Sequence, residues 1–283
     1  MTLLQSPLEE VIQRLRSNDS TLTFLFASSP PYLSGEPLRL GSSLRIARFV
    51  ITRLQFFQPP GEGFWEALVV NTKVTCLVVP PLELEETEER GFARVLSLNS
   101  TLQTLVVDMC TLNGDWALGL GEGLAGHSAL TSITIIETNS GDNGGKRIGE
   151  ALNVNSTLTF LQCNFTEIGA ATLGEALAVN ATLTQLSLQH SSIGDLGGAK
   201  FAEALAVNSS LTLLDLSFTR FGDDFTVALE DAMAVNSTLT RLDSSSTRIR
   251  ESELLLSLVE RNRVNHDLKS VSLFELLLPS FDL

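Results

Sequence analysis

The sequence predicts an α/β fold in the form of a single curved solenoid, or horseshoe, with a parallel β-sheet on its concave face and helices on its convex face. The first observation is that V-N-S-T-L-T stands at residues 154–159 and again at 235–240, with a close copy at 207–212. The second is a series of leucines at steps of 28, 28, 25, 28 and 28 residues: Leu102, Leu130, Leu158, Leu183, Leu211 and Leu239. Self-similarity at such a period is typical of repeat proteins.

Each repeat is predicted to be a strand followed by a helix. The pattern L-x-x-L-x-L, as in Leu183, Leu186 and Leu188, puts apolar residues on one face of a short strand, and helical spacing follows, as from Phe201 to Leu205. A unit this small cannot bury its apolar face alone, so neighbouring units must stack. Strands lie about 4.8 Å apart and packed helices about 8–10 Å apart, so the stack must curve with the sheet inside.

The repeat resembles a known family. Residues 204–224, ALAVNSSLTLLDLSFTRFGDD, are similar to leucine-rich repeats of the ribonuclease-inhibitor-like subclass, such as those of NOD-like immune receptors and related arrays in bacteria and protists. The resemblance implies a leucine-rich repeat fold with about 28 residues per repeat. The family usually has Asn after the strand, whereas this chain has mostly hydroxyl residues there, including Thr166, Ser191, Thr219 and Thr247. We expect these hydroxyls to bond to turn backbone.

The whole chain, 1–283, is expected to form one leucine-rich repeat domain. Its predicted sections are an N-terminal helical cap at 1–21, irregular Pro-containing repeats at 22–101, regular repeats at 102–267 and a C-terminal cap at 268–283. Within the irregular section the extended register predicts strands from Leu22, Leu44 and Val74. Pro-rich loops interrupt these units.

Both ends are expected to protect the sheet. Ser6-Pro7-Leu8-Glu9 resembles a capping box with Pro at the first helical position, which predicts a helix that runs through Arg16. Leu268 is expected to begin one more strand. Its apolar tail either covers the edge of the last strand, leaving a monomer, or serves as a homodimer surface.

Composition excludes several classes of partner. A net charge of −14 and a pI near 4.6 disfavour nucleic acid and anionic membranes as partners, because both attract positive patches. The amino terminus does not resemble a secretory leader, and no run of about 18 apolar residues occurs. Cys76, Cys110 and Cys163 are far apart, without a C-x-x-C pair, so we expect a reducing, cytoplasmic compartment.

The sequence contains partial matches to nucleotide-binding and metal-binding motifs, but their positions do not fit such sites. Residues 121–126 match G-x-G-x-x-G, but they fall on predicted helical core positions rather than directly after a strand. Gly144-Gly145-Lys146-Arg147 lacks the Ser/Thr and the upstream Gly of a P-loop. The histidines His127, His190 and His266 lie at different offsets, so they cannot gather around a metal. We expect no enzyme, cofactor or metal site.

Asn-x-Ser/Thr, the acceptor pattern for N-linked sugars, occurs seven times. The asparagines are Asn18, Asn99, Asn155, Asn164, Asn180, Asn208 and Asn236. All but Asn164 fall at the corner between a helix and the next strand. The repeat predicts an architectural role there, with Asn in the left-handed backbone position that follows a helix, and no glycosylation.

The x positions of L-x-x-L-x-L should point to the concave face, so the sequence can be written as columns on that face. One column is a stripe of threonines that we expect to be structural. Two groups stand out from it. The candidate partner-binding residues are Phe160, Phe165, Leu213 and Phe218 in an apolar set, and Gln162, Gln185, His190, Asp215, Arg241 and Asp243 in a polar set. Aromatic residues ringed by polar groups are typical of protein interfaces, although Phe165 and Phe218 could instead be buried under their loops.

These observations favour a non-catalytic scaffold for protein–protein interaction. It would bind a protein partner on the concave face and the strand-to-helix loops, in signalling, immunity or pathogen–host contact. One alternative is a regulator of a small GTPase, because Ran GTPase-activating proteins share this repeat subclass, although their regulatory residues find no matching motif here. Another is a recognition fragment of a larger receptor or effector.

Overall fold

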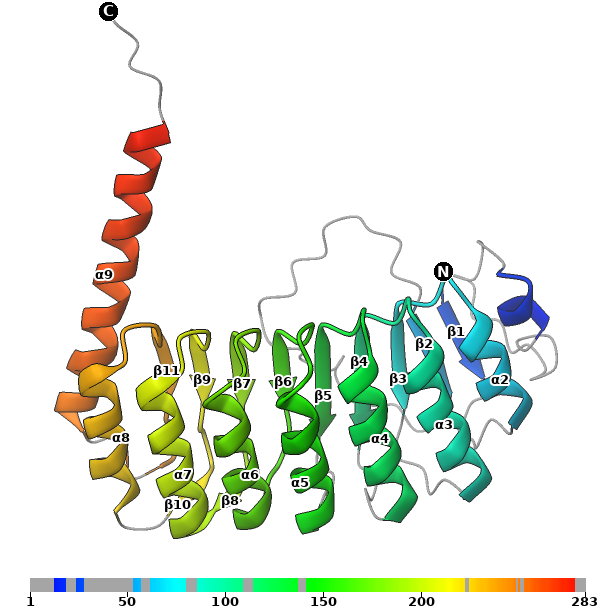
Figure 1. Cartoon of the computed structure of the whole chain (residues 1–283), viewed down its shortest axis with the longest axis horizontal. Helices are drawn as coiled ribbons and strands as arrows, with labels where there is room; N and C mark the ends of the chain where they lie inside the picture. Colours follow the sequence, from blue (N-terminus) through cyan, green and yellow to red (C-terminus); the bar gives the residue numbers. More distant parts are fainter. Residues whose placement is uncertain are drawn as a thin grey trace, which may run out of the picture.

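The computed structural model describes residues 13–18, 24–27, 53–56, 62–79, 86–108, 114–136, 141–221, 224–247, 249 and 252–277. Helices and strands alternate along a single row of repeats, with the strands side by side in one layer and the helices in the other (Figure 1). The predicted α/β leucine-rich repeat solenoid is therefore confirmed. In the part of the chain that is described, none of the helices combines the length and hydrophobicity of a bilayer-spanning segment.

Most repeats contain one strand of the main sheet and one helix. The strands are β1 (Phe24–Ala27), β2 (Arg53–Phe56), β3 (Cys76–Val79), β4 (Thr104–Asp108), β5 (Ser132–Ile136), β6 (Phe160–Gln162), β7 (Gln185–Ser187), β8 (Ser192–Ile193), β9 (Leu213–Asp215), β10 (Arg220–Phe221) and β11 (Arg241–Asp243). The helices are α2 (Glu62–Val70), α3 (Glu86–Leu98), α4 (Gly114–Gly126), α5 (Gly141–Leu152), α6 (Glu167–Leu177), α7 (Gly194–Val207), α8 (Phe225–Val235) and α9 (Glu253–Leu277).

The strands pair in parallel and in register. Among the described residues the main sheet has the order β1-β2-β3-β4-β5-β6-β7-β9-β11, while β8 and β10 form a small second sheet. Equivalent positions of successive repeats are partners, so Phe160 pairs with Gln185 and Gln185 with Leu213. The short unit that begins at Leu158 keeps this register, because its missing residues fall between β6 and α6, which residues 163–166 alone connect.

The core lies between the sheet and the helices. The repeat leucines predicted from the sequence, such as Leu102, Leu158 and Leu211, are fully buried there. Two glycines of the G-x-G-x-x-G match, Gly121 and Gly123, let neighbouring helices approach closely: a Cβ added to Gly123 would lie 2.4 Å from the Cβ of Leu96 on α3. This motif therefore serves helix packing, as its predicted position on α4 indicated.

A ladder of buried asparagines joins the repeats; all but the last, Asn262 within α9, lie at the corner where a helix leads to the next strand. Its members are Asn71, Asn99, Asn155, Asn180, Asn208, Asn236 and Asn262, with His127 in the equivalent place. Asn208 is representative: its Nδ2 donates to Leu177 O at 2.7 Å and Asn180 O at 3.2 Å in the preceding repeat. Its Oδ1 accepts from the amides of Ser210 and Leu211 at 3.1 and 2.8 Å.

The architectural role predicted for these asparagines is correct, but the predicted left-handed backbone is wrong for most of them. Asn18 has φ 52°, whereas Asn208 and Asn236 are extended, with φ near −69° and −67°. The extended conformation turns the chain directly into the strand, while Oδ1 binds the amides that follow. Because Nδ2, the atom that would carry a sugar, is buried and donates hydrogen bonds, the folded ladder has no place for a glycan.

The hydroxyl residues bond to backbone as predicted. In the threonine stripe, the Oγ1 of Thr212 donates to Thr184 O at 3.1 Å, and other members repeat this bond to the preceding repeat. After the strands, Thr219 Oγ1 donates to Leu188 O at 2.6 Å, and Ser191 Oγ accepts from the amide of Phe165 at 2.9 Å. These hydroxyls therefore hold neighbouring repeats together and are not available as binding groups.

The N-terminal section departs from the predicted register. β2 begins at Arg53, two residues after Ile51, and pairs with β1 and β3. The strand predicted from Leu44 falls outside the described residues, and β2 lies after it in the chain. Ile51, Leu54 and Phe56 satisfy L-x-x-L-x-L, whereas the series from Leu44 has only Ala47 at its second position. The predicted start of the first helix at Ser6 lies outside the described residues, and its helical end at residues 13–16 agrees with the prediction.

The C-terminal section also differs. The strand predicted from Leu268 is wrong, because residues 253–277 form the single helix α9, which extends beyond the row of repeats (Figure 1). The first half of α9 closes the array: Asn262 Nδ2 donates to Asn236 O at 3.0 Å, and Arg261 binds the last carbonyls of α8, including Met233 O at 2.9 Å. Leu268, on the second half, is 62% exposed. The role predicted for the tail beyond this point stays a prediction.

Candidate functional site: the concave face of β6, β7, β9 and β11

The C-terminal half of the sheet brings most of the predicted site residues together. They form two rows across β6, β7, β9 and β11: Phe160, Gln185, Leu213 and Arg241 in the first, and Gln162, Ser187, Asp215 and Asp243 in the second. Gln185, Arg241 and Asp243 are exposed, while Phe160, Gln162, Leu213 and Asp215 are half-buried. We call this surface the two-row face. Its second row is polar, while its first row alternates apolar Phe160 and Leu213 with polar Gln185 and Arg241.

Asp215 is fixed in place by neutral donors. Its Oδ1 accepts from the amide of Ser217 at 2.9 Å and from the Ser217 hydroxyl at 2.6 Å. Its Oδ2 accepts from the side-chain amide of Gln189. The sequence reasoning missed Gln189 and Ser217 as members of the site. A polar residue just after a strand was the available signal, but nothing in the pattern shows that its side chain turns back to the carboxylate.

Asp243 and Ser187 have groups without a partner in the described structure. Asp243 Oδ1 accepts from the amide of Ser245 at 2.9 Å, and its other oxygen has no hydrogen bond among the described residues. Ser187, which pairs with both Gln162 and Asp215, is 7% exposed, and its hydroxyl has no hydrogen-bond partner there. A buried hydroxyl without a partner costs about 1–3 kcal/mol. The second row therefore contains unused hydrogen-bonding capacity.

His190 and Phe218 form an aromatic pair where β7 and β9 end. Their rings are stacked, with centroids 5.0 Å apart and planes 10° apart. Both residues have left-handed backbone, with φ 58° and 57°, and Ser246 takes the same conformation one repeat later. Phe218 is 54% exposed. Of the two outcomes that the sequence allowed for Phe218, the exposed one is correct.

Phe165 does not belong to this surface. It is 3% exposed, and its ring lies against α5 and α6, where Gly145 and Gly169 leave room for it. The reason is the shortened connection between β6 and α6. Without the extra residues, the turn has no left-handed residue at this position and Phe165 points into the core. Of the two outcomes that the sequence allowed for Phe165, the buried one is correct.

The concave face changes character towards the N-terminus. Cys76, Val78 and Val106, on β3 and β4, form a buried apolar cluster separate from the main core. Cys76 stands at an x position of the repeat that begins at Val74, which the sequence pattern places on the concave face. Its side chain is on that face, but it is only 8% exposed. Among the described side chains on the strands of the main sheet, the exposed polar ones, Gln185, Arg241 and Asp243, lie on the two-row face.

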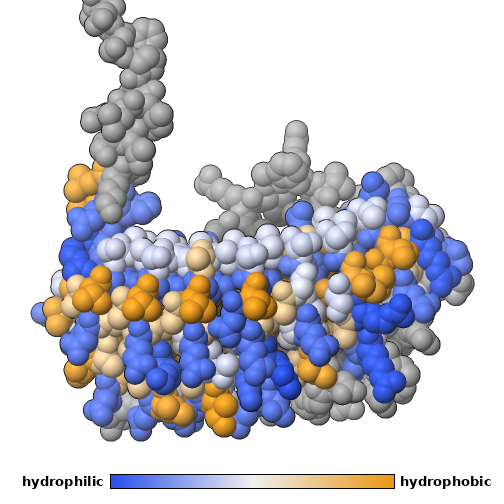
Figure 2. Space-filling model, in the orientation of Figure 1, coloured by the Kyte–Doolittle hydropathy of each residue, from blue (hydrophilic) through white to orange (hydrophobic). Residues whose placement is uncertain are grey.

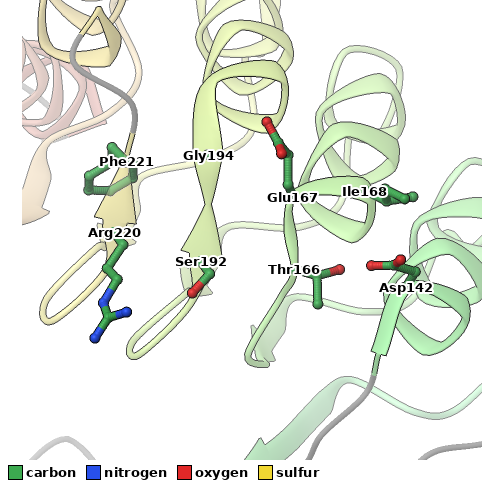
Figure 3. Close-up of a pocket in the computed structure, with 8 residues that line it drawn as sticks. All are labelled: Asp142, Thr166, Glu167, Ile168, Ser192, Gly194, Arg220 and Phe221. Carbon is green, nitrogen blue, oxygen red and sulfur yellow. The ribbon is translucent and has the colours of Figure 1, made fainter.

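A cavity of about 460 Å³ lies among the strand-to-helix loops. Its lining includes Asp142 from the first turn of α5, Thr166 and Glu167 at the start of α6, and Arg220 from β10 (Figure 3). Glu167 Oε1 accepts from the amide of Leu196 at 2.8 Å, so it also anchors α7. The cavity lies in loops that the sequence predicted to contribute to partner binding.

A stripe of exposed apolar residues follows the ends of the helices. Each member directly precedes a ladder asparagine, and Figure 2 shows several of them as a row of hydrophobic spots. The stripe consists of Val70, Leu98, Val154, Val179, Val207 and Val235, which are 57–68% exposed. Gly126 interrupts it. The stripe could not be recognised from the sequence, because its residues fit the apolar helical pattern.

His127, one of the three histidines in the sequence, occupies the ladder position that neighbouring repeats give to asparagine. Its Nδ1 accepts from the amides of Ala129 and Leu130 at 3.1 and 3.0 Å, while its buried Nε2 has no partner in the described structure. Burial lowers the pKa of His127 below its ordinary value. Within the described part of the chain, no three His, Cys, Asp or Glu side chains come together to hold a metal.

The comparisons with known proteins concern the fold. No protein-family model matches the chain, and no curated protein matches it. Among solved structures, "Leiomodin-1 Actin-Binding Site 2 (ABS2)" aligns at 20% identity with a TM-score of 0.47, covering 58% of this chain and 97% of that one. The tropomodulin C-terminal domain from Caenorhabditis elegans aligns at 12% identity with a TM-score of 0.24, covering 94% and 99% of the two chains. At these values the likeness gives no indication of what the chain binds.

Proposed function

We propose that the protein is a non-catalytic scaffold that binds a protein partner through the two-row face and the neighbouring strand-to-helix loops. The observation that carries the proposal is the exposed His190–Phe218 stack. A non-glycine residue in left-handed backbone costs about 1–2 kcal/mol, and an exposed phenylalanine gains little from the protein core. Strain of this kind occurs preferentially at functional sites, and large exposed aromatic residues are frequent anchors of interfaces.

The remaining features of the surface support binding rather than catalysis. Asp215 accepts hydrogen bonds from Ser217 and Gln189, so its carboxylate stabilises the turn that follows β9. A catalytic pair would need an accessible nucleophile within hydrogen-bond reach of a base. The Ser217 hydroxyl donates to Asp215 at 2.6 Å, but Ser217 is only 3% exposed, so this pair is not placed to attack a substrate. A rim of polar groups around aromatic anchors is the usual arrangement of a protein interface. We include a cytoplasmic location and a ribonuclease-inhibitor-like repeat subclass in this proposal.

Site-resolved crosslinking tests the proposal. A photo-reactive phenylalanine analogue is placed at Gln185 or Phe218 on the proposed site, and at Val207 on the exposed stripe as the control. Each variant is illuminated in an extract of the cells from which the chain derives. Crosslinks to one protein at positions 185 and 218, but not at 207, are expected. A partner that crosslinks at 207 alone would show that the stripe, rather than the two-row face, is the binding surface.

A further inference from the structure

We propose that the two-row face recognises an arginine side chain of its protein partner, held between Asp243 and the His190–Phe218 stack. This inference rests on the proposed function and specifies its chemistry. It depends on three independent observations: an uncompensated pair of carboxylates, a buried hydroxyl without a partner, and a flat aromatic surface beside them.

Two carboxylates, those of Asp215 and Asp243, stand side by side in the second row. Asp215 and Asp243 are register partners on adjacent strands, about 4.8 Å apart in the sheet direction. Like charges placed opposite each other destabilise a sheet, and neither carboxylate forms an ion pair among the described residues. Asp215 is surrounded by neutral donors, but Asp243 keeps one oxygen without a bond there. A cation at this oxygen would neutralise the pair.

The buried hydroxyl of Ser187 points to a ligand independently of charge. Ser187 lies next to Asp215 in the same row, is more than nine-tenths buried and has no hydrogen-bond partner in the described structure. Native proteins rarely leave such groups unpaired. A donor from a partner that reaches the floor of the second row would satisfy the Ser187 oxygen.

The aromatic stack distinguishes arginine from lysine. The two rings stack on each other, only 10° from parallel, at the carboxyl ends of β7 and β9, so the flat surface left for a ligand is the outer face of a ring. A guanidinium group is planar, stacks on aromatic faces and carries five donors, so it can bind a carboxylate while it lies on a ring. An ammonium group is compact and more strongly hydrated. The net charge of −14 further favours a basic partner.

The test is an NMR titration with three blocked amino acids: N-acetyl methylamides of arginine, lysine and glutamate. The backbone amides of Ser217 and Ser245 are the reporters, because they donate to Asp215 and Asp243. We expect the arginine compound to shift both amides with a Kd of about 1–10 mM. The lysine compound should bind at least threefold more weakly, and the glutamate compound should cause no shift.

Variants separate the site from general charge attraction. Asp243→Asn keeps the acceptor for Ser245 and removes the charge, and Phe218→Ala removes part of the stack; each should weaken arginine binding about fivefold. Asp231→Asn, an exposed position on α8, makes the same change of net charge and should leave it within twofold. Equal weakening by Asp231→Asn and Asp243→Asn would overturn the inference, as would equal binding of lysine and arginine.

The outcome can be separated from that of the proposed function. If the partner crosslinks at positions 185 and 218 but the arginine compound leaves Ser217 and Ser245 unshifted, the arginine inference is wrong and the binding surface stands. If the arginine compound binds and a crosslink forms only at Val207, the pocket for a basic group is real but the protein interface lies elsewhere.

Discussion

His127 stands where the neighbouring repeats have asparagine, and we predict that His127→Asn stabilises the protein. The ladder asparagines donate through Nδ2 to carbonyls of the preceding repeat, as Asn99 does to Leu68 O at 2.8 Å and Asn71 O at 3.0 Å. The imidazole of His127 reproduces only the acceptor half of this arrangement, through Nδ1. Asparagine would restore the donor half.

The magnitude follows from the bonds. Two new hydrogen bonds contribute about 0.5–1.5 kcal/mol each, and removal of the unpaired Nε2 recovers about 1–3 kcal/mol. The smaller side chain leaves space that costs about 1–3 kcal/mol. The net increase in the free energy of unfolding is therefore about 1–3 kcal/mol. For a chain of this length, a rise in Tm of about 2–4 °C per kcal/mol is expected.

The dependence on pH provides a second signature. The pKa of His127 is lowered in the folded state, so folding favours the neutral ring. This contribution to stability is complete above the unfolded pKa, near 6.5, and is lost as the pH falls below it towards the folded pKa. Protonation would also place a hydrogen on Nδ1 and break both bonds to the backbone. His127→Asn should therefore flatten the loss of stability between pH 7 and pH 5.

Hydrogen exchange at the Leu130 amide, together with thermal unfolding at pH 7 and pH 5, measures both effects. His266→Asn is the matched control, because His266 is exposed on α9 and lies outside the ladder. It should change neither stability nor its dependence on pH. The reasoning would be refuted by a His127→Asn chain that is less stable than the wild type at pH 7, or that loses the same stability towards pH 5.

Three further substitutions test the fold and the site. Asn208→Ala removes the ladder bonds of one repeat and should lower the free energy of unfolding, measured by urea denaturation, by about 3–5 kcal/mol. Gly123→Ala brings a Cβ to 2.4 Å from Leu96 Cβ and should lower Tm, at a cost of about 1–2 kcal/mol, whereas Gly126→Ala, with nothing within 4 Å, should not. Phe218→Asn relieves left-handed strain and should raise stability by about 1 kcal/mol in the same denaturation assay, while it abolishes the partner crosslink at position 185.

The regular repeats could be predicted because two signals agree in them. The leucine spacing marks the strand, and the corner V-N-S-T-L marks where it begins. The same corner misled the prediction at the C-terminus, where Val264-Asn265-His266-Asp267-Leu268 imitates it. These residues continue a helix, and Asn262 instead of Asn265 joins the ladder. The spacing of Leu268, Val271 and Leu273 fits a strand, but nothing there interrupts the helix.

The candidate site was predictable in position but not in detail. The period puts Gln185, Asp215 and Asp243 on one face of the sheet, and the structure agrees. It also aligned Phe165 with His190 and Phe218, because all three follow their leading leucine by the same number of residues. The short connection between β6 and α6 turns the Phe165 side chain into the core. The spacing of the leucines shows that this repeat is three residues short, but not which part of the repeat is shortened.

The asparagine ladder has a consequence for how the array can change its length. Asn208 and Asn236 each donate through Nδ2 to carbonyls of the preceding repeat and accept through Oδ1 from the amide that leads into the next strand. Equivalent atoms are therefore bonded at successive repeat boundaries. A second copy of residues 181–208 inserted after Asn208 would find matching partners on both sides. Gene duplication could therefore lengthen the horseshoe by one repeat without a new interface. The asparagines mark the boundaries at which such modules can be exchanged.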